Sequence, residues 1–332
     1  CIRDRSARGR FGEPACGLVS QRAGPVPRQH GNAGARLIRP QTAKALESDA
    51  AITDTDWRQA LNPPIYLVSI LPGLGVPLLA RFPVENAGGL LLATIAVVLL
   101  QHAINLFNDA ADWRLGADVE KHDSWVRVHG ERPRTAMLHG VLSLLAGGFL
   151  GLGLLWHQDQ LWILLIALPM VGLGYLYNAG SKPLSYTHLG EWVTGICYGP
   201  GVFGCLWLVG GLEPDTPMLA GMVAFGALAV ALLLSHQPSQ IETDRHAGKL
   251  SFAVRFGTAQ TVFAARILFA VFVFSICAAV AMAASVGVTF VLCVLALVLL
   301  FSLSVSWVNP NRILTAASVF LAAGLSMVRF AG

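Results

Sequence analysis

Charged residues are scarce in this sequence. Asp, Glu, Lys and Arg together make up 13% of its 332 residues, whereas 55% are hydrophobic. The mean hydropathy is +0.60. This composition excludes an ordinary soluble enzyme, because so many apolar residues exceed what a water-soluble core needs. It indicates a protein that is embedded in a lipid bilayer.

The few basic residues are unevenly distributed. The formal net charge is +4, and the excess lies in residues 1–58, which hold ten Lys and Arg against six Asp and Glu. Residues 59–332 hold thirteen of each. Nucleic-acid binding usually requires basic residues clustered on one face of a protein. The body of the chain has no such excess, so we expect no nucleic-acid partner.

Cysteine is also rare. The sequence has six Cys residues and no C-x-x-C pair. The last four lie in apolar runs, where Cys behaves as a small hydrophobic residue. This arrangement predicts neither a disulfide framework nor a zinc site.

The N-terminal part of the chain differs from the rest. Residues 1–46 are rich in Arg, Gly and Pro without a sustained apolar period, and the first Met of the sequence, Met137, lies inside a hydrophobic run. We expect residues 1–52 to be a disordered or spurious tail, with an organellar targeting peptide as the alternative. Residues 53–332 form the predicted membrane domain, which begins with a short helix capped by Thr and Asp at positions 53–56.

Nine apolar stretches are long enough to span a bilayer. They lie near residues 65–82, 88–107, 135–156, 160–178, 190–211, 217–236, 262–284, 286–306 and 312–330. The predicted fold class is therefore an all-α membrane protein. The loops after the second, fourth and sixth stretches hold nearly all Lys and Arg of the body. The positive-inside rule predicts that these loops and the N-terminus are cytoplasmic. A bacterial plasma membrane is the default expectation for the location.

A stripe of polar residues runs along the end of the second stretch. Its members repeat at four, three and four positions and share one face of a helix: Gln101, Asn105, Asn108 and Asp112. Asp109 lies beside the stripe and Asp118 follows it. Carboxylates are costly against lipid, so the stripe is predicted to line a pocket. Carboxylates without His or Cys suit Mg²⁺, which proteins often bind with one or two acids plus substrate phosphates.

A second polar cluster follows the sixth stretch. His236, Gln240 and Asp244 repeat every four positions and can share a helical face, while Pro238 is expected to kink or break the span. Both clusters contain an acid followed by Arg and Gly. This pattern suggests two halves that face one cavity.

These residues resemble the UbiA superfamily of intramembrane prenyltransferases, and within it the 1,4-dihydroxy-2-naphthoate polyprenyltransferases of menaquinone synthesis. The first cluster is similar to N-D-x-x-D-x-x-x-G-x-D at residues 108–118. Further similarity lies at residues 177–184, 189–200 and 241–257, so that the resemblance covers about residues 57–332.

The second cluster departs from the family pattern at one position. The family has two aspartates four residues apart, and the first of them is Gln240 in this sequence. An amide oxygen can still bind a cation, but it removes one negative charge from the site. Three outcomes are open: Glu242 compensates, a second Mg²⁺ binds more weakly, or the acceptor differs.

The resemblance implies a helical bundle around a central cavity, polyprenyl diphosphate and an aromatic quinone precursor as substrates, and Mg²⁺ as cofactor. The implied metal ligands are Asp109, Asp112, Asp118, Asp244 and Glu242. The implied catalytic residues are Asp109, Asp112, Asp244, Arg114, Arg245 and Lys182. The implied substrate-binding residues are Gln101, Asn105, Asn108, Tyr177, Glu191 and Gln240.

Other functions are less well supported by the same residues. The acceptor is expected to be 1,4-dihydroxy-2-naphthoate, with 4-hydroxybenzoate or another quinone precursor as the alternative. A transporter would place its ionisable groups near the middle of the membrane, whereas here they lie at the helix ends. A non-catalytic relative is a third possibility, motivated by Gln240. The match of Gly199–Gly204 to G-x-G-x-x-G follows no strand and predicts no nucleotide site.

Overall fold

The computed structural model describes residues 56–81, 83–117, 121, 123–282, 284–303, 307 and 309–331. The predicted N-terminal tail and Asp118 lie outside these residues. Within the described part of the chain every regular element is a helix, which confirms the predicted all-α fold class.

The helices follow one another with short connections. The elements are α2 (Trp57–Leu61), η1 (Pro63–Tyr66), α3 (Leu67–Leu79), α4 (Ala87–Leu115), α5 (Trp125–Val128), α6 (Pro133–His157), η2 (Leu161–Ile163), α7 (Leu164–Asn178), η3 (Leu184–Tyr186), α8 (Gly190–Ile196), η4 (Cys197–Gly204), α9 (Cys205–Val209), α10 (Thr216–His236), η5 (Gln237–Gln240), α11 (Ile241–His246), α12 (Phe252–Ala281), α13 (Val286–Ser302) and α14 (Pro310–Ala331).

Within the described residues, eight of the nine predicted spans are helices that are long and apolar enough to cross a membrane. The ninth, α13, is an apolar helix of 17 residues, so the predicted count of nine is approximate. Large apolar side chains such as Phe149, Leu165 and Phe301 are well exposed on the bundle surface. Such side chains suit contact with lipid tails, and the chain is a multi-pass integral membrane protein.

Local sequence signals set the helix ends that matter for the site. Asp56 caps α2 by accepting from the Arg58 amide at 3.1 Å, as the Thr and Asp residues predicted. Helix α4 continues past the predicted end of its span to Leu115, where Gly116 adopts a left-handed conformation with φ 83°. The polar stripe therefore lies on one continuous helix.

Helices α8 and α9 are joined by η4, a π-helical segment that contains Pro200. This segment packs closely on α10, because a Cβ atom added to Gly199 would lie 2.5 Å from the Met222 carbonyl oxygen. Small residues permit such close approach between helices in lipid. The G-x-G-x-x-G match therefore lies in a helix-packing segment.

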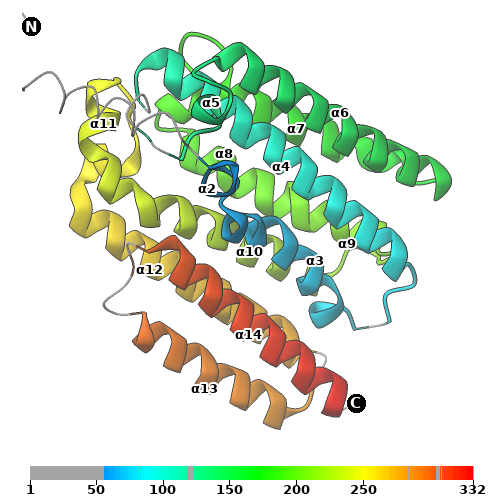
Figure 1. Cartoon of the computed structure of the whole chain (residues 1–332). Coiled ribbons are helices and arrows are strands. Elements are labelled where there is room, and N and C mark those ends of the chain that lie inside the picture. The colour runs from blue at the N-terminus through cyan, green and yellow to red at the C-terminus, as the bar shows by residue number, and fades with distance from the viewer. Residues whose placement is uncertain are drawn as a thin grey trace, which may run out of the picture. The chain divides into compact units, whose positions relative to one another are not determined.

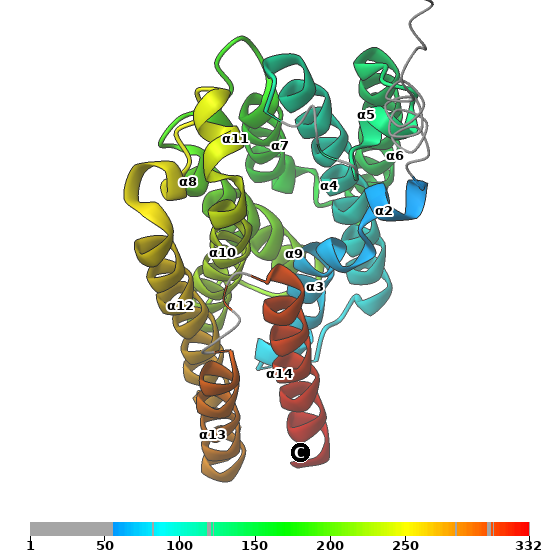
Figure 2. The ribbon, with the colours of Figure 1, turned by 60° about the vertical axis from the view of Figure 1, so that its left-hand side comes forward.

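Helices pack in neighbouring pairs along the bundle. Helix α4 packs along α6, and α10 packs along α12, while α14 lies beside α3 and α13 (Figures 1 and 2). Buried aromatic side chains fill the space between α10 and α12, with the rings of Phe225 and Phe272 5.8 Å apart. The ends of α4, α7 and α10 and the short α11 gather at the same end of the bundle (Figures 1 and 2). This end holds the two predicted polar clusters.

Candidate active site at the polar end of the bundle

The first polar cluster is organised around Asp112, which is 2% exposed. Its Oδ1 accepts a hydrogen bond from the Tyr186 hydroxyl at 2.8 Å. Its Oδ2 accepts from the Asn108 amide at 2.9 Å, as expected for residues four apart on one helix. A residue of its own helix and one from η3 therefore hold this carboxylate in place.

The second polar cluster contributes Asp244, which is also buried. The Ser251 hydroxyl donates to its Oδ2 at 2.7 Å. The predicted break at Pro238 is confirmed, because α10 ends at His236 and the chain continues through η5 into α11. Pro238 lacks a backbone N–H and cannot continue the α-helical hydrogen bonding.

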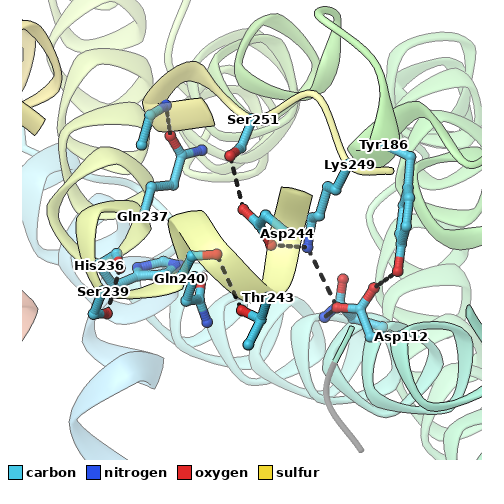
Figure 3. Close-up of polar contacts among 12 residues, drawn as sticks. Asp112, Tyr186, His236, Gln237, Ser239, Gln240, Thr243, Asp244, Lys249 and Ser251 are labelled. Atoms are coloured by element: carbon cyan, nitrogen blue, oxygen red, sulfur yellow. Dashed lines mark hydrogen bonds and ion pairs between the residues drawn. The ribbon is translucent and has the colours of Figure 1, made fainter. Parts of the chain in front are cut away.

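Lys249 joins the two clusters. Its Nζ lies 3.4 Å from Oδ2 of Asp112 and 3.8 Å from Oδ1 of Asp244 (Figure 3). Gly248, with φ 73°, turns the chain after α11, and the Lys249 amide donates to the Asp244 carbonyl at 2.8 Å. This turn brings the lysine back over its own helix. The Lys249 ammonium also lies 5.3 Å from the centre of the Tyr186 ring.

Asp109 faces a different neighbour from Asp112. Its Oδ1 pairs with the Lys121 ammonium at 3.1 Å, and its Oδ2 accepts from the Trp125 amide at 2.8 Å. Both partners belong to the segment between α4 and α6. Asp109 therefore attaches this segment to α4, and its carboxylate is held by protein groups.

Glu191 lies at the start of α8 and is buried. Its carboxylate accepts from the Gln237 amide at 3.2 Å and the Phe252 amide at 2.7 Å, and it pairs with Arg255 at 3.2 Å. These contacts tie α8 to η5 and to the start of α12. The predicted substrate-binding residue is thus engaged in connecting three elements.

A small cavity of about 30 Å³ borders the second polar cluster. Its lining includes Tyr177, Glu191, His236, Gln240, Asp244 and Lys249. The predicted helical face of His236, Gln240 and Asp244 therefore does border one cavity. Figure 3 shows His236 and Gln240 on one side of Asp244, and Lys249 and Asp112 on the other.

The inner end of the polar stripe reaches a second cavity, of about 200 Å³. Gln101 and Asn105 line it together with Ser69, Met170 and Tyr198. The Gln101 amide nitrogen donates to the Ile65 carbonyl at 3.3 Å, while its buried oxygen has no hydrogen-bond partner among the described residues. A buried amide oxygen without a partner is costly, and a ligand hydroxyl would satisfy it.

Four predicted site residues lie away from these cavities. Arg245 and Glu242 pair with each other at 3.0 Å on the exposed side of α11. Arg114 is exposed and donates to the Ala110 carbonyl at 3.2 Å, and Lys182 is exposed on the segment after α7. The structure does not bring these four side chains to the buried carboxylates.

Sequence reasoning missed Tyr186, Lys249 and Ser251. Lys249 stands five residues after Asp244, and Tyr186 closely follows the matched Lys182-Pro183-Leu184. Both residues lie near segments that match the family pattern, and this proximity was the available signal that they belong to the site. Neither residue belongs to a helical repeat with an acid, so spacing gave no reason to select them.

The fold and site together define a class of protein: a multi-pass helical bundle in which two acid-bearing helix ends meet beside apolar cavities. Residues 67–327 match the UbiA prenyltransferase family, and the chain belongs to this family.

Named relatives agree with this assignment. The chain is 33% identical to a 1,4-dihydroxy-2-naphthoate octaprenyltransferase of Mycobacterium tuberculosis over 52% of this chain and 59% of the relative. It therefore spans less than two thirds of that relative's length. It is 29% identical to the Bacillus subtilis protein of the same name, over 65% of this chain and 70% of the relative. It is 30% identical to a 2-carboxy-1,4-naphthoquinone phytyltransferase of Synechocystis, over 66% of this chain and 71% of the relative.

The fold also resembles a solved structure, a UbiA homolog from Archaeoglobus fulgidus bound to GPP and Mg²⁺. The TM-score is 0.59 at 20% sequence identity, and the match covers 82% of this chain and 99% of that one. At this identity the likeness confirms the fold.

Proposed function

We propose that this chain transfers a polyprenyl group from polyprenyl diphosphate to 1,4-dihydroxy-2-naphthoate, a step of menaquinone biosynthesis, with Mg²⁺ as cofactor. The observation that carries the proposal is the bridge from Asp112 through Lys249 to Asp244, which joins both family motifs. The names of the relatives from M. tuberculosis and B. subtilis support the choice of acceptor.

The donor set fits a hard cation. The described residues contain no group of three His, Cys, Asp or Glu side chains that could hold a metal ion unaided. Mg²⁺ in phosphate-transfer and related sites is commonly held by one or two carboxylates together with substrate phosphates. Asp112 and Asp244 supply two buried carboxylates, and Asp118 remains a predicted ligand outside the described residues. When bound, Mg²⁺ would neutralise the negative charge of the diphosphate.

The protein's own groups would assist departure of the diphosphate. The Lys249 ammonium lies between the two carboxylates, where it can contact a diphosphate oxygen and balance the charge that develops as the carbon–oxygen bond breaks. The Tyr186 hydroxyl, which donates to Asp112, keeps that carboxylate oriented. Both groups act in a largely buried site, where electrostatic interactions are stronger than in water.

The acceptor would occupy the cavity at the inner end of the stripe. Its volume of about 200 Å³ suits a bicyclic ring, and apolar residues of α4, α7 and η4 line most of it. The unpartnered oxygen of Gln101 can accept a hydrogen bond from a ring hydroxyl. An apolar wall would also shield an allylic cation from water until the ring attacks it.

The site is proposed to face the cytoplasm of a bacterial cell. Residues 114–134 and 245–255, at the site's end of the bundle, hold eight of the thirteen Lys and Arg residues of positions 59–332. Positively charged loops remain on the cytoplasmic side of bacterial membranes.

A membrane assay tests the proposed activity. Membranes that contain the protein are incubated with polyprenyl diphosphate, Mg²⁺ and either 1,4-dihydroxy-2-naphthoate or 4-hydroxybenzoate. We expect prenylation of the naphthoate, and Asp112→Asn should abolish it while the protein remains in the membrane. Asp123→Asn, at an exposed loop carboxylate, is the matched control. Near-normal transfer by the Asp112 variant would contradict the site, and exclusive use of 4-hydroxybenzoate would contradict the acceptor.

A further inference from the structure

A large apolar groove lies along α10, which packs against both α8 and α12 (Figure 2). Its volume is about 990 Å³. Among its lining residues, Leu219, Val223 and Phe263 are well exposed, as suits side chains on a lipid-facing surface. The groove shares no lining residue with the proposed acceptor cavity and one, Glu191, with the small cavity. It therefore opens toward the bilayer and is distinct from the acceptor cavity.

Close packing of α8 and α10 contributes to the hollow. A Cβ atom added to Gly226 would lie 2.8 Å from the Gly195 carbonyl oxygen, and both glycines line the groove. The lining residues of α10 extend from Leu219 to Leu234, a rise of about 22 Å in an α-helix. The hydrocarbon core of a bilayer is about 30 Å thick. A groove of this length can hold an extended alkyl chain that lies along α10.

Arg255 provides a cation at one end of the groove. Its Nη2 donates to Oε2 of Glu191 at 3.2 Å. The guanidinium carbon lies 5.7 Å from the ring centre of Phe252 and 5.1 Å from that of Phe256, so both rings stabilise the cation. The other guanidinium nitrogens have no hydrogen-bond acceptor among the described residues. An arginine carries five N–H donors, so several of them can serve a ligand.

Glu191 holds this guanidinium in place and is the less exposed member of the pair. Its carboxylate also accepts from the Gln237 amide and the Phe252 amide. The Glu191 side chain is 11% exposed, and that of Arg255 is 27% exposed. No other acid is found among the described residues that line the groove. The groove therefore combines apolar walls with an accessible cation.

The backbone sets the position of Arg255 relative to the groove. Gly257, with φ 79° and ψ 172°, interrupts α12 in a conformation that is essentially restricted to glycine. The turn Phe252–Phe256 is therefore set off from the longer part of α12. Trp192 of α8 lines the same groove and is 72% exposed. Exposed Trp side chains are typical of the headgroup level of a membrane.

These features suit an anionic phospholipid better than a prenyl diphosphate. A guanidinium can bind a phosphate through several charge-assisted hydrogen bonds. A diphosphate is commonly bound with Mg²⁺ on one or two carboxylates, whereas the one acid of this groove is engaged by three donors. For the same reason the lining offers no carboxylate to the ammonium of a zwitterionic headgroup.

We propose that the groove along α10 is a binding site for an anionic phospholipid of the bilayer. An acyl chain lies along α10, and the headgroup phosphate accepts hydrogen bonds from Arg255. Basic pockets between membrane helices bind anionic headgroups in this way. The bound lipid stabilises the pair of Arg255 with Glu191, and thereby the contacts that join α8 to η5 and α12. This inference goes beyond the proposed prenyl transfer and does not depend on it.

Lipid binding to the purified full chain in a nonionic detergent tests the proposal. The probes are dioleoylphosphatidylglycerol, which is anionic, and dioleoylphosphatidylcholine, which is zwitterionic. We expect native mass spectrometry to show one retained phosphatidylglycerol. The melting temperature should rise with its concentration, because a ligand that binds the folded state stabilises it. Equal retention of the two lipids, or equal stabilisation by them, would overturn the proposal.

A variant of the cation tests the headgroup contact. Arg255→Gln should weaken the binding of phosphatidylglycerol about tenfold or more, as expected when hydrogen bonds to a charged group are lost. Arg245→Gln is the matched control, because it removes a cation from an exposed pair on the neighbouring α11. The control should bind the lipid as wild type does. An affinity of the Arg255 variant equal to that of the control would contradict the assignment.

A variant of the wall tests the acyl-chain contact and leaves Arg255 with its partner. Val223→Trp adds a large side chain to the groove at a residue that is 55% exposed, so it should not disturb the buried core. Val298→Trp on α13, at a residue that is 56% exposed and outside the groove, is the matched control. We expect the first variant to lose the bound phosphatidylglycerol and the second to retain it. Equal retention by both variants would refute the proposed position of the acyl chain.

Competition identifies the occupant. Geranylgeranyl diphosphate with Mg²⁺ should leave phosphatidylglycerol bound to wild type, and displacement of the lipid would show that the groove holds the prenyl donor instead. None of these measurements requires turnover. A chain that transfers no prenyl group would contradict the proposed function, and the binding of phosphatidylglycerol would still decide whether the lipid site exists.

Discussion

Replacing Lys249 with Met is predicted to destabilise the protein strongly in the absence of ligands. The ammonium lies 3.4 Å from one carboxylate oxygen of Asp112 and 3.8 Å from one of Asp244. The lysine side chain is 15% exposed, and those of the two acids are 3% and 5% exposed, so water screens these pairs little. Met has a similar length and apolar stem but leaves two buried acids without their shared cation.

The expected loss can be bounded. A charge pair about 4 Å apart interacts by roughly 4 kcal/mol at an effective dielectric constant of about 20. Removing one partner of a buried pair typically costs about 3–5 kcal/mol, because an uncompensated charge remains. We therefore expect the free energy of unfolding to fall by about 3–5 kcal/mol.

Unfolding of the detergent-solubilised protein measures this loss. Arg245→Met is the control, because it also removes a cation from α11 but from an exposed pair with Glu242. Exposed pairs contribute little to stability. Added Mg²⁺ should raise the melting temperature of the Lys249 variant more than that of wild type, because a cation can again compensate the acids.

A double-mutant cycle decides whether the bridge itself is responsible. Asp112→Asn removes one of the two carboxylates, so its combination with Lys249→Met should be less destabilising than the sum of the single changes. An interaction energy below about 0.5 kcal/mol would refute the reasoning. So would equal stabilisation of variant and wild type by Mg²⁺.

Three further predictions follow from single positions. Gln240→Asp restores the family's acid at the small cavity, so calorimetry should show tighter binding of Mn²⁺ or Mg²⁺. An unchanged affinity would show that the side chain at position 240 does not contact the metal. Gly199→Ala should destabilise the protein by about 1–3 kcal/mol because its Cβ meets the α10 backbone, whereas Gly172→Ala, with nothing within 4 Å, should not. The pKa of His129 is lowered in the folded protein, so the unfolded chain binds a proton at this residue more readily. The melting temperature should therefore fall as the pH drops through about 6.5, and it should fall less in the His129→Gln variant.

The sequence predicted the fold and the face of each polar cluster well. Hydropathy and length locate helices because every backbone group in lipid must form its hydrogen bonds within a helix. The stripe at Asn108 and Asp112 was predictable because residues four apart on a helix are neighbours. The cavity face of His236, Gln240 and Asp244 followed from the same periodicity, although the helix changes type at Pro238.

Contacts between distant segments were not predictable in this way. Asp109 lies one position from Asn108, and its pairing with Lys121 and Trp125 depends on how the segment after α4 folds back. Lys249 reaches Asp112, 137 residues earlier, only because Gly248 reverses the chain. Glu242 was a reasonable ligand by sequence, yet on α11 it lies on the face opposite the buried Asp244, where it meets Arg245.

The buried lysine explains how an altered second cluster can remain part of one site. With Gln240 in place of an acid, Asp244 is the buried carboxylate of that cluster, and Lys249 links it to Asp112. The Lys249 ammonium balances one of the two carboxylate charges, so the site between the two family motifs keeps a net negative charge. In the proposed function, a site of that charge would still attract a divalent cation that arrives with an anionic diphosphate, because the flexible lysine side chain could turn from the acids to the phosphate oxygens. We therefore expect the proposed prenyl transfer to depend on the Asp112–Lys249–Asp244 connection more than on the residue at position 240.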